Sequence, residues 1–200
     1  MEIIDLTRIL DDHLSIYTDG DYTDPPLEID TWCTVQEQGY QVFCLSMGTQ
    51  TGTHIDAPAH FVAGGASLEA LPLQALMGLY RWVDLNQVTP AELKELGSDP
   101  SSGTILFLAS SAHAEVIISQ EAFNALLGLP CLVWVIANGI RVAGREGYFF
   151  NRSLAEAGKF LIEDVDESAA MRVKPGGQII ALPLRLGGVP GSPCRVIVRQ

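Results

Sequence analysis

The stretch Gln50–His60 constrains the fold and the chemistry of this 200-residue chain most strongly. It reads Gln-Thr-Gly-Thr-His-Ile-Asp-Ala-Pro-Ala-His. In an extended strand, residues two apart point to the same side, so His54 and Asp56 can converge on one point. Pro58 fixes its own φ and biases the preceding residue away from the helical region, so the chain must turn before His60, which can lean back toward that point. The stretch therefore predicts a strand end that carries a metal or catalytic site.

A second interpretation of the same stretch is a polar turn held together by hydrogen bonds, and the residues alone leave both open. A single histidine is usually hydrogen bonded or solvated, and we interpret His13 and His113 in that way. Gly52 would let the backbone pass close to a bound group. The joint spacing of these residue types favours a metal or catalytic site over the polar turn.

Two further polar residues are candidate ligands, and each has an ordinary alternative interpretation. Gln50 could offer its amide oxygen, although an amide is a weak ligand and the residue could equally be solvated. Glu163 follows an apolar segment, so the residues alone favour an exposed acid at a strand end over a metal ligand.

Composition indicates how many domains the chain forms and which partners it is not expected to bind. A chain of 200 residues that is 48% hydrophobic can bury one substantial core, which predicts one domain over residues 1–200. Its 24 acidic and 12 basic residues give a net charge of −12 without a Lys/Arg cluster, so nucleic acid is not an expected partner.

Compartment is inferred from the apolar stretches, the N-terminus and the cysteines. The longest apolar stretches, such as Leu126–Ile136, are too short to span a bilayer, so no membrane partner is expected. The N-terminal Met-Glu-Ile-Ile-Asp carries acids where a signal peptide carries bases. The four cysteines are scattered without a paired motif, as in a reducing compartment. We expect a cytoplasmic protein.

Strand and helix signals alternate along the chain, which predicts an α/β fold. The expected loop is the acidic, turn-rich stretch 11–26, and a hairpin is expected around Gln38-Gly39. Strands are expected at residues 3–6, 29–36, 40–47, 80–85, 104–109, 131–136, 160–162, 178–186 and 195–199. Helices are expected at 90–96, 119–127 and 153–157.

The sequence resembles the metal-dependent cyclase family, which includes bacterial kynurenine formamidases and isatin hydrolases. The family pattern reads His-Thr-Gly-Thr-His-x-Asp-x-Pro-x-His, and Thr51 to His60 match it in register. The likeness continues in Phe61, in Gly64-Gly65, in the Asp-Leu-Thr near the start and in the closing segments 181–185 and 191–195. The resemblance thus covers the whole chain.

This resemblance implies a mixed sheet with a barrel-like core flanked by helices, commonly in a homodimer or higher homo-oligomer. It implies hydrolysis of an amide, formamide, lactam or lactone of a small carboxylate-bearing substrate at a zinc or manganese site. By the same resemblance, His54, Asp56 and Glu163 are metal ligands, His60 shuttles protons, and Tyr17 contacts the substrate.

The chain departs from the family pattern at two ligand positions. Gln50 stands where the pattern opens with a histidine, and Asn151 stands where a later histidine precedes the glutamate by twelve residues. An amide oxygen is a poorer zinc ligand than imidazole, so one ion is expected where the family binds two. The alternative is a non-catalytic member whose eroded metal site binds a small metabolite or a partner.

Overall fold

The computed structural model describes residues 1–98, 104–110 and 115–200, so His113 lies outside the described residues. The strands of the main sheet are β1 (Ile3–Asp5), β6 (His54–Asp56), β7 (Met77–Asp84), β8 (Ile105–Ala109), β10 (Val133–Ile136), β12 (Phe160–Glu163), β13 (Gln178–Pro183) and β14 (Gly191–Arg199). The smaller pairs are β2 (Thr18–Asp19) with β3 (Tyr22–Thr23), β4 (Glu28–Cys33) with β5 (Val42–Ser46), and β9 (Val116–Ile118) with β11 (Ile140–Val142).

The α-helices are α1 (Val35–Gln38), α2 (Pro90–Ser98), α3 (Gln120–Leu127), α4 (Phe149–Glu156) and α5 (Glu167–Ala170). Three short 3₁₀ helices, η1 (Pro58–His60), η2 (Leu68–Ala70) and η3 (Leu73–Leu76), follow β6. No helix of the described part of the chain is long and apolar enough to cross a membrane.

The main sheet closes on itself. Its strand order is β1-β14-β13-β7-β8-β10-β12-β6, and β6 also pairs with β14, so seven strands form a barrel to which β1 is added at the edge of β14. Strands β7, β8, β10 and β12 are parallel neighbours, whereas the remaining pairs are antiparallel. Strand β14 pairs with both β6 and β13, so this one long strand closes the ring. The mixed α/β barrel with flanking helices agrees with the expected fold.

Side chains alternate between two cores along the buried strands. Ile105 and Phe107 of β8 lie in the same cluster as Ile55 of β6, inside the barrel. Leu106 and Leu108 point the other way, into a second cluster that also holds apolar residues of α2, α3 and α4. The continuous apolar runs expected of buried parallel strands are therefore explained by burial on both faces.

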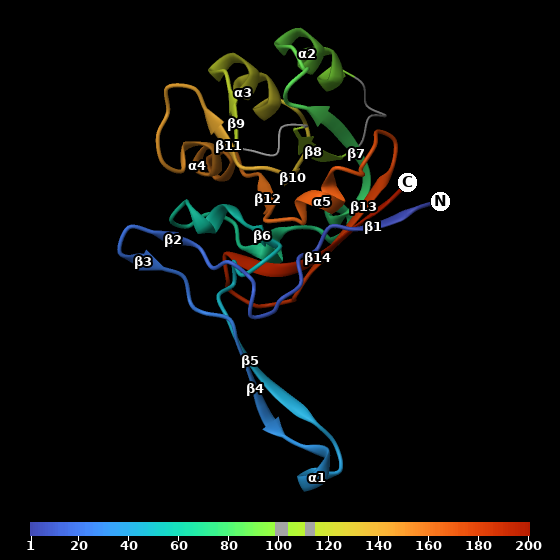
Figure 1. Ribbon diagram of the computed structural model, residues 1–200. Coiled ribbons are helices and arrows are strands. Elements are labelled where there is room, and N and C mark those ends of the chain that lie inside the picture. Colours follow the sequence, from blue (N-terminus) through green and yellow to red (C-terminus); the bar gives the residue numbers. More distant parts are fainter. Residues whose placement is uncertain (99–103, 111–114) are drawn as a thin grey trace.

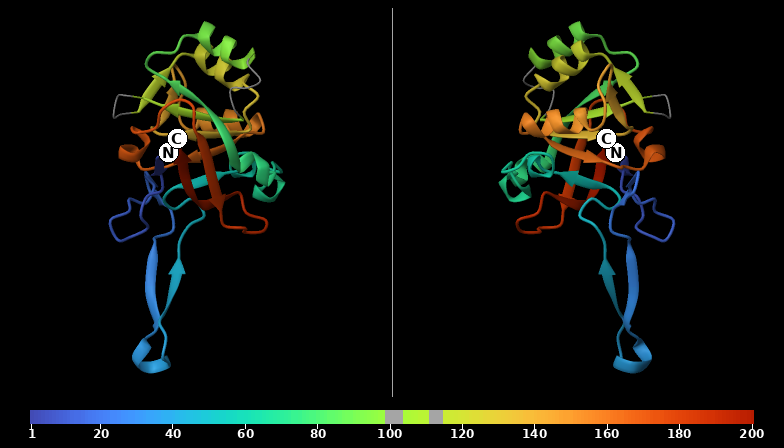
Figure 2. Two further views of the ribbon diagram at one scale, coloured as in Figure 1. Left: turned by 90° about the vertical axis from the view of Figure 1, so that its right-hand side faces the viewer. Right: turned by 90° about the vertical axis from the view of Figure 1, so that its left-hand side faces the viewer.

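The hairpin of β4 and β5 stands clear of the barrel in all three views (Figures 1 and 2). Its tip holds α1, which begins at a capping box formed by Thr34 and Glu37 and ends at Gly39 with φ 80°. The predicted hairpin around residues 38 and 39 is correct, although the tip is one helical turn rather than a tight turn. We call residues 28–46 the arm.

Some sequence-based boundaries were wrong. The stretch 11–26, expected to be a loop, contains the small β2–β3 hairpin. The helix expected at 153–157 begins at Phe149, because apolar side chains pack its first turn although Tyr148 makes no side-chain cap. The strand expected to reach residue 186 ends at Pro183, and the last strand begins at Gly191 where it pairs with β6.

Candidate metal centre

The candidate site lies on the outer face of the barrel, where β6 lies between β12 and β14. Ile55 points into the barrel core, so the alternation of the strand directs His54 and Asp56 outward on the same side. Both side chains are nevertheless buried, with exposed fractions of 4% and 5%. The convergence expected from two-residue spacing is thus present in the structure.

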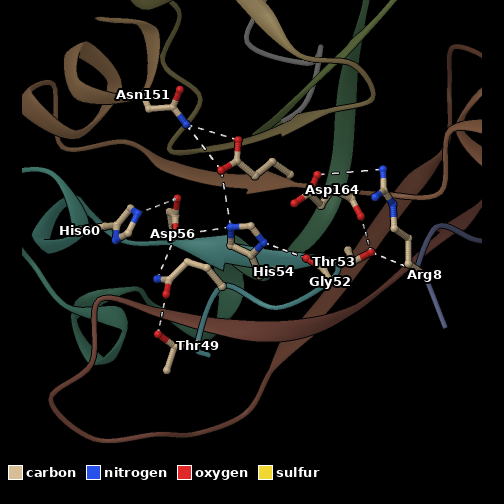
Figure 3. Close-up of polar contacts among 11 residues, drawn as sticks. Arg8, Thr49, Gly52, Thr53, His54, Asp56, His60, Asn151 and Asp164 are labelled. Atoms are coloured by element: carbon tan, nitrogen blue, oxygen red, sulfur yellow. Dashed lines mark hydrogen bonds and ion pairs between the residues drawn. The ribbon is translucent and has the colours of Figure 1, made fainter. Parts of the chain in front are cut away.

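Cross-strand register adds Glu163 to this pair. In the antiparallel pairing of β12 with β6, Glu163 lies directly opposite His54. The Nε2 atom of His54 is 3.5 Å from Oε1 of Glu163 and 3.7 Å from Oδ1 of Asp56 (Figure 3). One ligand atom from each of the three residues lies within 4.8 Å of the other two, which is a spacing that one metal ion can bridge.

The hydrogen bonding of His54 fixes which nitrogen faces the carboxylates. Its Nδ1 lies 2.8 Å from the carbonyl oxygen of Gly52, and because a carbonyl only accepts, Nδ1 carries the hydrogen. In the neutral ring Nε2 then presents a lone pair to two carboxylates. Burial opposes protonation of the ring, yet hydrogen bonds and attraction from Asp56 and Glu163 raise the pKa of His54 well above its usual value. The arrangement therefore favours a cation at Nε2, either a proton or a metal ion.

The carboxylates also fit a bound cation. Oδ2 of Asp56 is buried and has no hydrogen-bond partner in the structure. Burial, together with the neighbouring charge of Asp56, raises the pKa of Glu163, although His54 opposes the shift. Since an unpartnered buried carboxylate oxygen is costly and the donor set combines imidazole nitrogen with carboxylate oxygen, these residues fit a divalent metal ion.

Gln50 contacts the centre through its amide nitrogen. Nε2 of Gln50 donates to Oδ1 of Asp56 at 3.3 Å, and Thr49 donates its hydroxyl hydrogen to Oε1 of Gln50 at 2.6 Å (Figure 3). Gly191 makes room for this amide, because a Cβ at that position would lie 2.1 Å from Nε2. In this orientation Gln50 supports a carboxylate instead of offering an oxygen to an ion.

Asn151 makes the equivalent contact on the other side. It lies in the first turn of α4, and its Nδ2 is 3.3 Å from Oε2 and 3.5 Å from Oε1 of Glu163 (Figure 3). An ionised carboxylate only accepts hydrogen bonds, so the amide nitrogen is the atom that must face it. Both amides that replace imidazoles of the family pattern therefore donate to a carboxylate of the candidate triad.

His60 leans back toward the centre as the turn at Pro58 requires. It ends η1, and its Nε2 is 3.9 Å from Oδ2 of Asp56. Its side chain is 33% exposed, and its ring packs edge-on against Phe61 with centroids 4.5 Å apart. His60 thus reaches both the triad and solvent, which is the position that proton exchange needs.

A second set of contacts holds the strand ends together. Thr53 donates to the carbonyl of Asp164 at 2.7 Å and accepts the backbone N–H of Arg8 at 2.9 Å (Figure 3). Asp164 has φ 55°, a left-handed conformation next to Glu163. Gly52 also has a positive φ, of 65°, and a Cβ there would lie 2.6 Å from Leu10, so its role is a tight turn packed against the N-terminal segment.

The centre opens into a cleft of about 790 Å³. Tyr17 lines it, and its hydroxyl contacts that of Tyr148, the residue before α4. The Tyr148 ring in turn packs on Phe61 with centroids 5.7 Å apart. Arg8, Asp164 and Tyr148 were not predicted from the sequence, and Thr53 was expected only as part of the matched motif, without its contacts to Arg8 and Asp164.

The chain is similar in sequence to a family model and to named relatives over most of its length. The Cyclase family model matches residues 4–151. A kynurenine formamidase of Bacillus cytotoxicus is 26% identical, covering 99% of this chain and 97% of its own. A kynurenine formamidase of Salinibacter ruber is 29% identical over 82% of both chains.

Solved structures share the fold. Isatin hydrolase A from Labrenzia aggregata superposes with a TM-score of 0.77 at 19% identity, covering 98% of this chain and 93% of its own. A protein described as a potential metal-dependent hydrolase with cyclase activity superposes with a TM-score of 0.71 at 25% identity, covering 100% and 98%.

Proposed function

The chain belongs to the Cyclase family, and from this membership we propose that it is a metal-dependent hydrolase acting on the C–N bond of a small amide, formamide or lactam, or on a lactone. The names of its relatives, kynurenine formamidase and isatin hydrolase, support this class of substrate. The observation that carries the proposal is the triad of His54, Asp56 and Glu163 beside His60 at the cleft, in which Oδ2 of Asp56 is buried without a hydrogen-bond partner.

His54, Asp56 and Glu163 would hold one divalent ion, zinc or manganese. One nitrogen and several oxygens make a harder donor set than three histidines, which gives manganese nearly equal weight. When bound, such an ion supplies Lewis-acid chemistry: it polarises a carbonyl oxygen and lowers the pKa of a water from about 15.7 toward roughly 7. Gln50 and Asn151 support the single-ion proposal because their amide nitrogens face the carboxylates.

His60 would act as general base and then general acid. Its neutral imidazole would accept a proton from the attacking water and return it to the leaving nitrogen, a role for which imidazole is the commonest side chain. Tyr17 would contact the substrate from the cleft wall, with the ring of Tyr148 beside it.

The experiment is a turnover assay of metal-loaded protein with a panel of aryl formamides, lactams and lactones. We expect hydrolysis by the native protein and a loss of about 10²–10⁴-fold in His60→Ala, with metal content unchanged. The matched control is His13→Ala, since His13 is exposed and does not line the cleft. Its activity should equal that of the native protein.

Two results would contradict this function. Equal turnover by His60→Ala and by the native protein would show that His60 is not the proton shuttle. Failure of every compound in the panel with a fully loaded protein would favour the non-catalytic alternative, in which the site binds a metabolite or a partner.

We also propose that the protein is a homodimer joined through the arm. Ile29 lies opposite Leu45, and Thr31 opposite Phe43, so these four residues share one face of the ribbon. Ile29, Phe43 and Leu45 are 46%, 52% and 52% exposed. A two-stranded ribbon with an uncovered apolar face is only marginally stable in water, so a second copy that covers it would stabilise the arm.

The domain that we propose spans residues 1–200, because β1 and β14 at the two ends pair within the sheet that carries the site. The compartment that we propose is the cytoplasm. The four cysteines are all free, as is usual where thiols remain reduced.

A further inference from the structure

The walls of the cleft beyond the triad carry mostly negative charge. Asp19 and Asp24 line it from the β2–β3 hairpin, and Glu115 and Asp164 line it from other segments. Among the described residues that line the cleft, Arg141 is the one arginine or lysine. Four carboxylates therefore face one guanidinium.

The cations near these acids are already engaged. Nη1 of Arg141 lies 3.5 Å from Oε2 of Glu115. Arg8, which is not a lining residue, lies 4.0 Å from Asp164. Within the described part of the chain, no ion pair involves the two hairpin acids, Asp19 and Asp24. An entering anion would thus meet uncompensated negative charge at the hairpin, while the one guanidinium among the described lining residues already pairs with Glu115.

Aromatic rings form the part of the cleft nearest His60. The rings of Phe61 and Tyr148 are 5.7 Å apart at 43°, and those of Tyr148 and Tyr17 are 6.3 Å apart at 57°. All three residues line the cleft. Such tilted neighbours leave edges and faces against which a planar ring can pack.

From these walls we infer that the cleft selects an aromatic amide without a carboxylate, neutral or cationic in charge. This inference rests on the proposed function. It differs from one implication of the family resemblance, namely that the substrate carries a carboxylate. Asp19 and Asp24 are the specificity-determining residues, because they are the lining acids without an ion-pair partner. A cationic group on the ring would find them on the hairpin side.

The test is direct binding of three benzamides to zinc-loaded protein by calorimetry. They carry a methyl, an aminomethyl or a carboxylate group at the para position. We expect the neutral and cationic ligands to bind about tenfold or more tightly than the anion, with the difference shrinking at high salt. Equal or tighter binding of the carboxylate, or no binding of any of the three, would overturn the inference.

Charge removal at the hairpin provides a second readout. In the double variant Asp19→Asn/Asp24→Asn the preference against the carboxylate should fall several-fold. The matched control is Asp21→Asn, which removes an acid from the turn of the same hairpin but not from the cleft lining. An unchanged preference in the double variant, or an equal change in the control, would contradict the assignment.

Turnover of the corresponding formanilides separates this inference from the proposed function. If the neutral and cationic benzamides bind preferentially but no formanilide is hydrolysed, the charge selection stands and the hydrolase proposal fails. If formanilides are hydrolysed with the carboxylate-bearing one preferred, the hydrolase proposal stands and the charge selection fails.

Discussion

At the scale of single residues, the negative charges of the candidate site are not balanced by positive charges. His54 directs a nitrogen at two carboxylates, Asp56 keeps one buried oxygen unpartnered, and Gln50 and Asn151 each donate to only one side of the cluster. A cation bound between the His54 nitrogen and the two carboxylates would satisfy all of these groups together. Proton and metal ion therefore compete for the same place.

This competition predicts a pH dependence of metal binding. The carboxylates raise the pKa of His54, so in metal-free protein the protonated ring contributes stability that is fully present below its unfolded pKa of about 6.5. That contribution is lost as pH rises through the higher folded-state pKa. Metal affinity should increase over the same range, because the competing proton leaves.

Calorimetry in buffers of different ionisation enthalpy measures this effect. We expect about one proton released per ion bound at pH 7, and the same release in His60→Ala, where the ligand set is intact. Binding without proton release, and with no change of affinity with pH, would show that His54 is already neutral in the metal-free protein.

At the scale of elements, the site depends on how strand ends are tied together. Strand β6 supplies two candidate ligands and β12 the third, and the hydroxyl of Thr53 connects the start of β6 to the residue after Glu163. The same hydroxyl accepts from the backbone of Arg8. One buried side chain therefore holds three segments that are distant in sequence.

Removing this hydroxyl should loosen the site. Thr53→Val keeps the shape but leaves the N–H of Arg8 and the carbonyl of Asp164 without their partner, which costs about 1–3 kcal/mol of unfolding free energy. Metal affinity should fall as well, since the end of β12 is less fixed. Urea denaturation and metal titration measure both effects, with Thr53→Ser as the control that keeps the hydroxyl. Equal stability of the two variants would contradict this role.

The elements also show what the sequence could predict. Two-residue alternation and the fixed φ of Pro58 are local rules, so the convergence of His54, Asp56 and His60 followed from them. The pairing of Glu163 with His54 depends on strand register, which is set by the closed barrel and not by either segment alone. The start of α4 was missed because it lacks a capping side chain and is fixed by packing.

Some features of the site could not be predicted from the residue types. Gln50 was expected as a candidate oxygen ligand, but which end of an amide faces a carboxylate depends on the neighbours that only the fold supplies. The short strands β9 and β11 were missed because each has three residues and pairs with a distant segment. Such non-local pairs leave almost no local signal.

At the scale of the whole molecule, the arm is the part whose exposed apolar face a single copy does not explain. It stands away from the barrel (Figure 1). The exposed side chains of Ile29, Phe43 and Leu45 give it an apolar face. Stable interfaces generally bury about 1,200–2,000 Å² in total, which an arm that packs across a second copy could supply.

Sedimentation velocity tests this arrangement. We expect a dimer at micromolar concentration, and a monomer in Phe43→Glu, because a charge on the apolar face cannot be buried without a partner. The control is Cys44→Ser on the opposite face of the ribbon, which should remain dimeric. A monomeric native protein, or a dimeric Phe43→Glu variant, would contradict the proposed arm interface.

The most direct test of the whole account is the number of metal ions per chain. Protein purified without chelator and supplied with zinc or manganese should hold about one ion per chain by mass spectrometry, and His54→Ala should hold none. Two ions would mean that Gln50 and Asn151 serve as ligands after all. No ion, even with excess metal, would contradict the metal centre and leave His60 without the chemistry proposed for it.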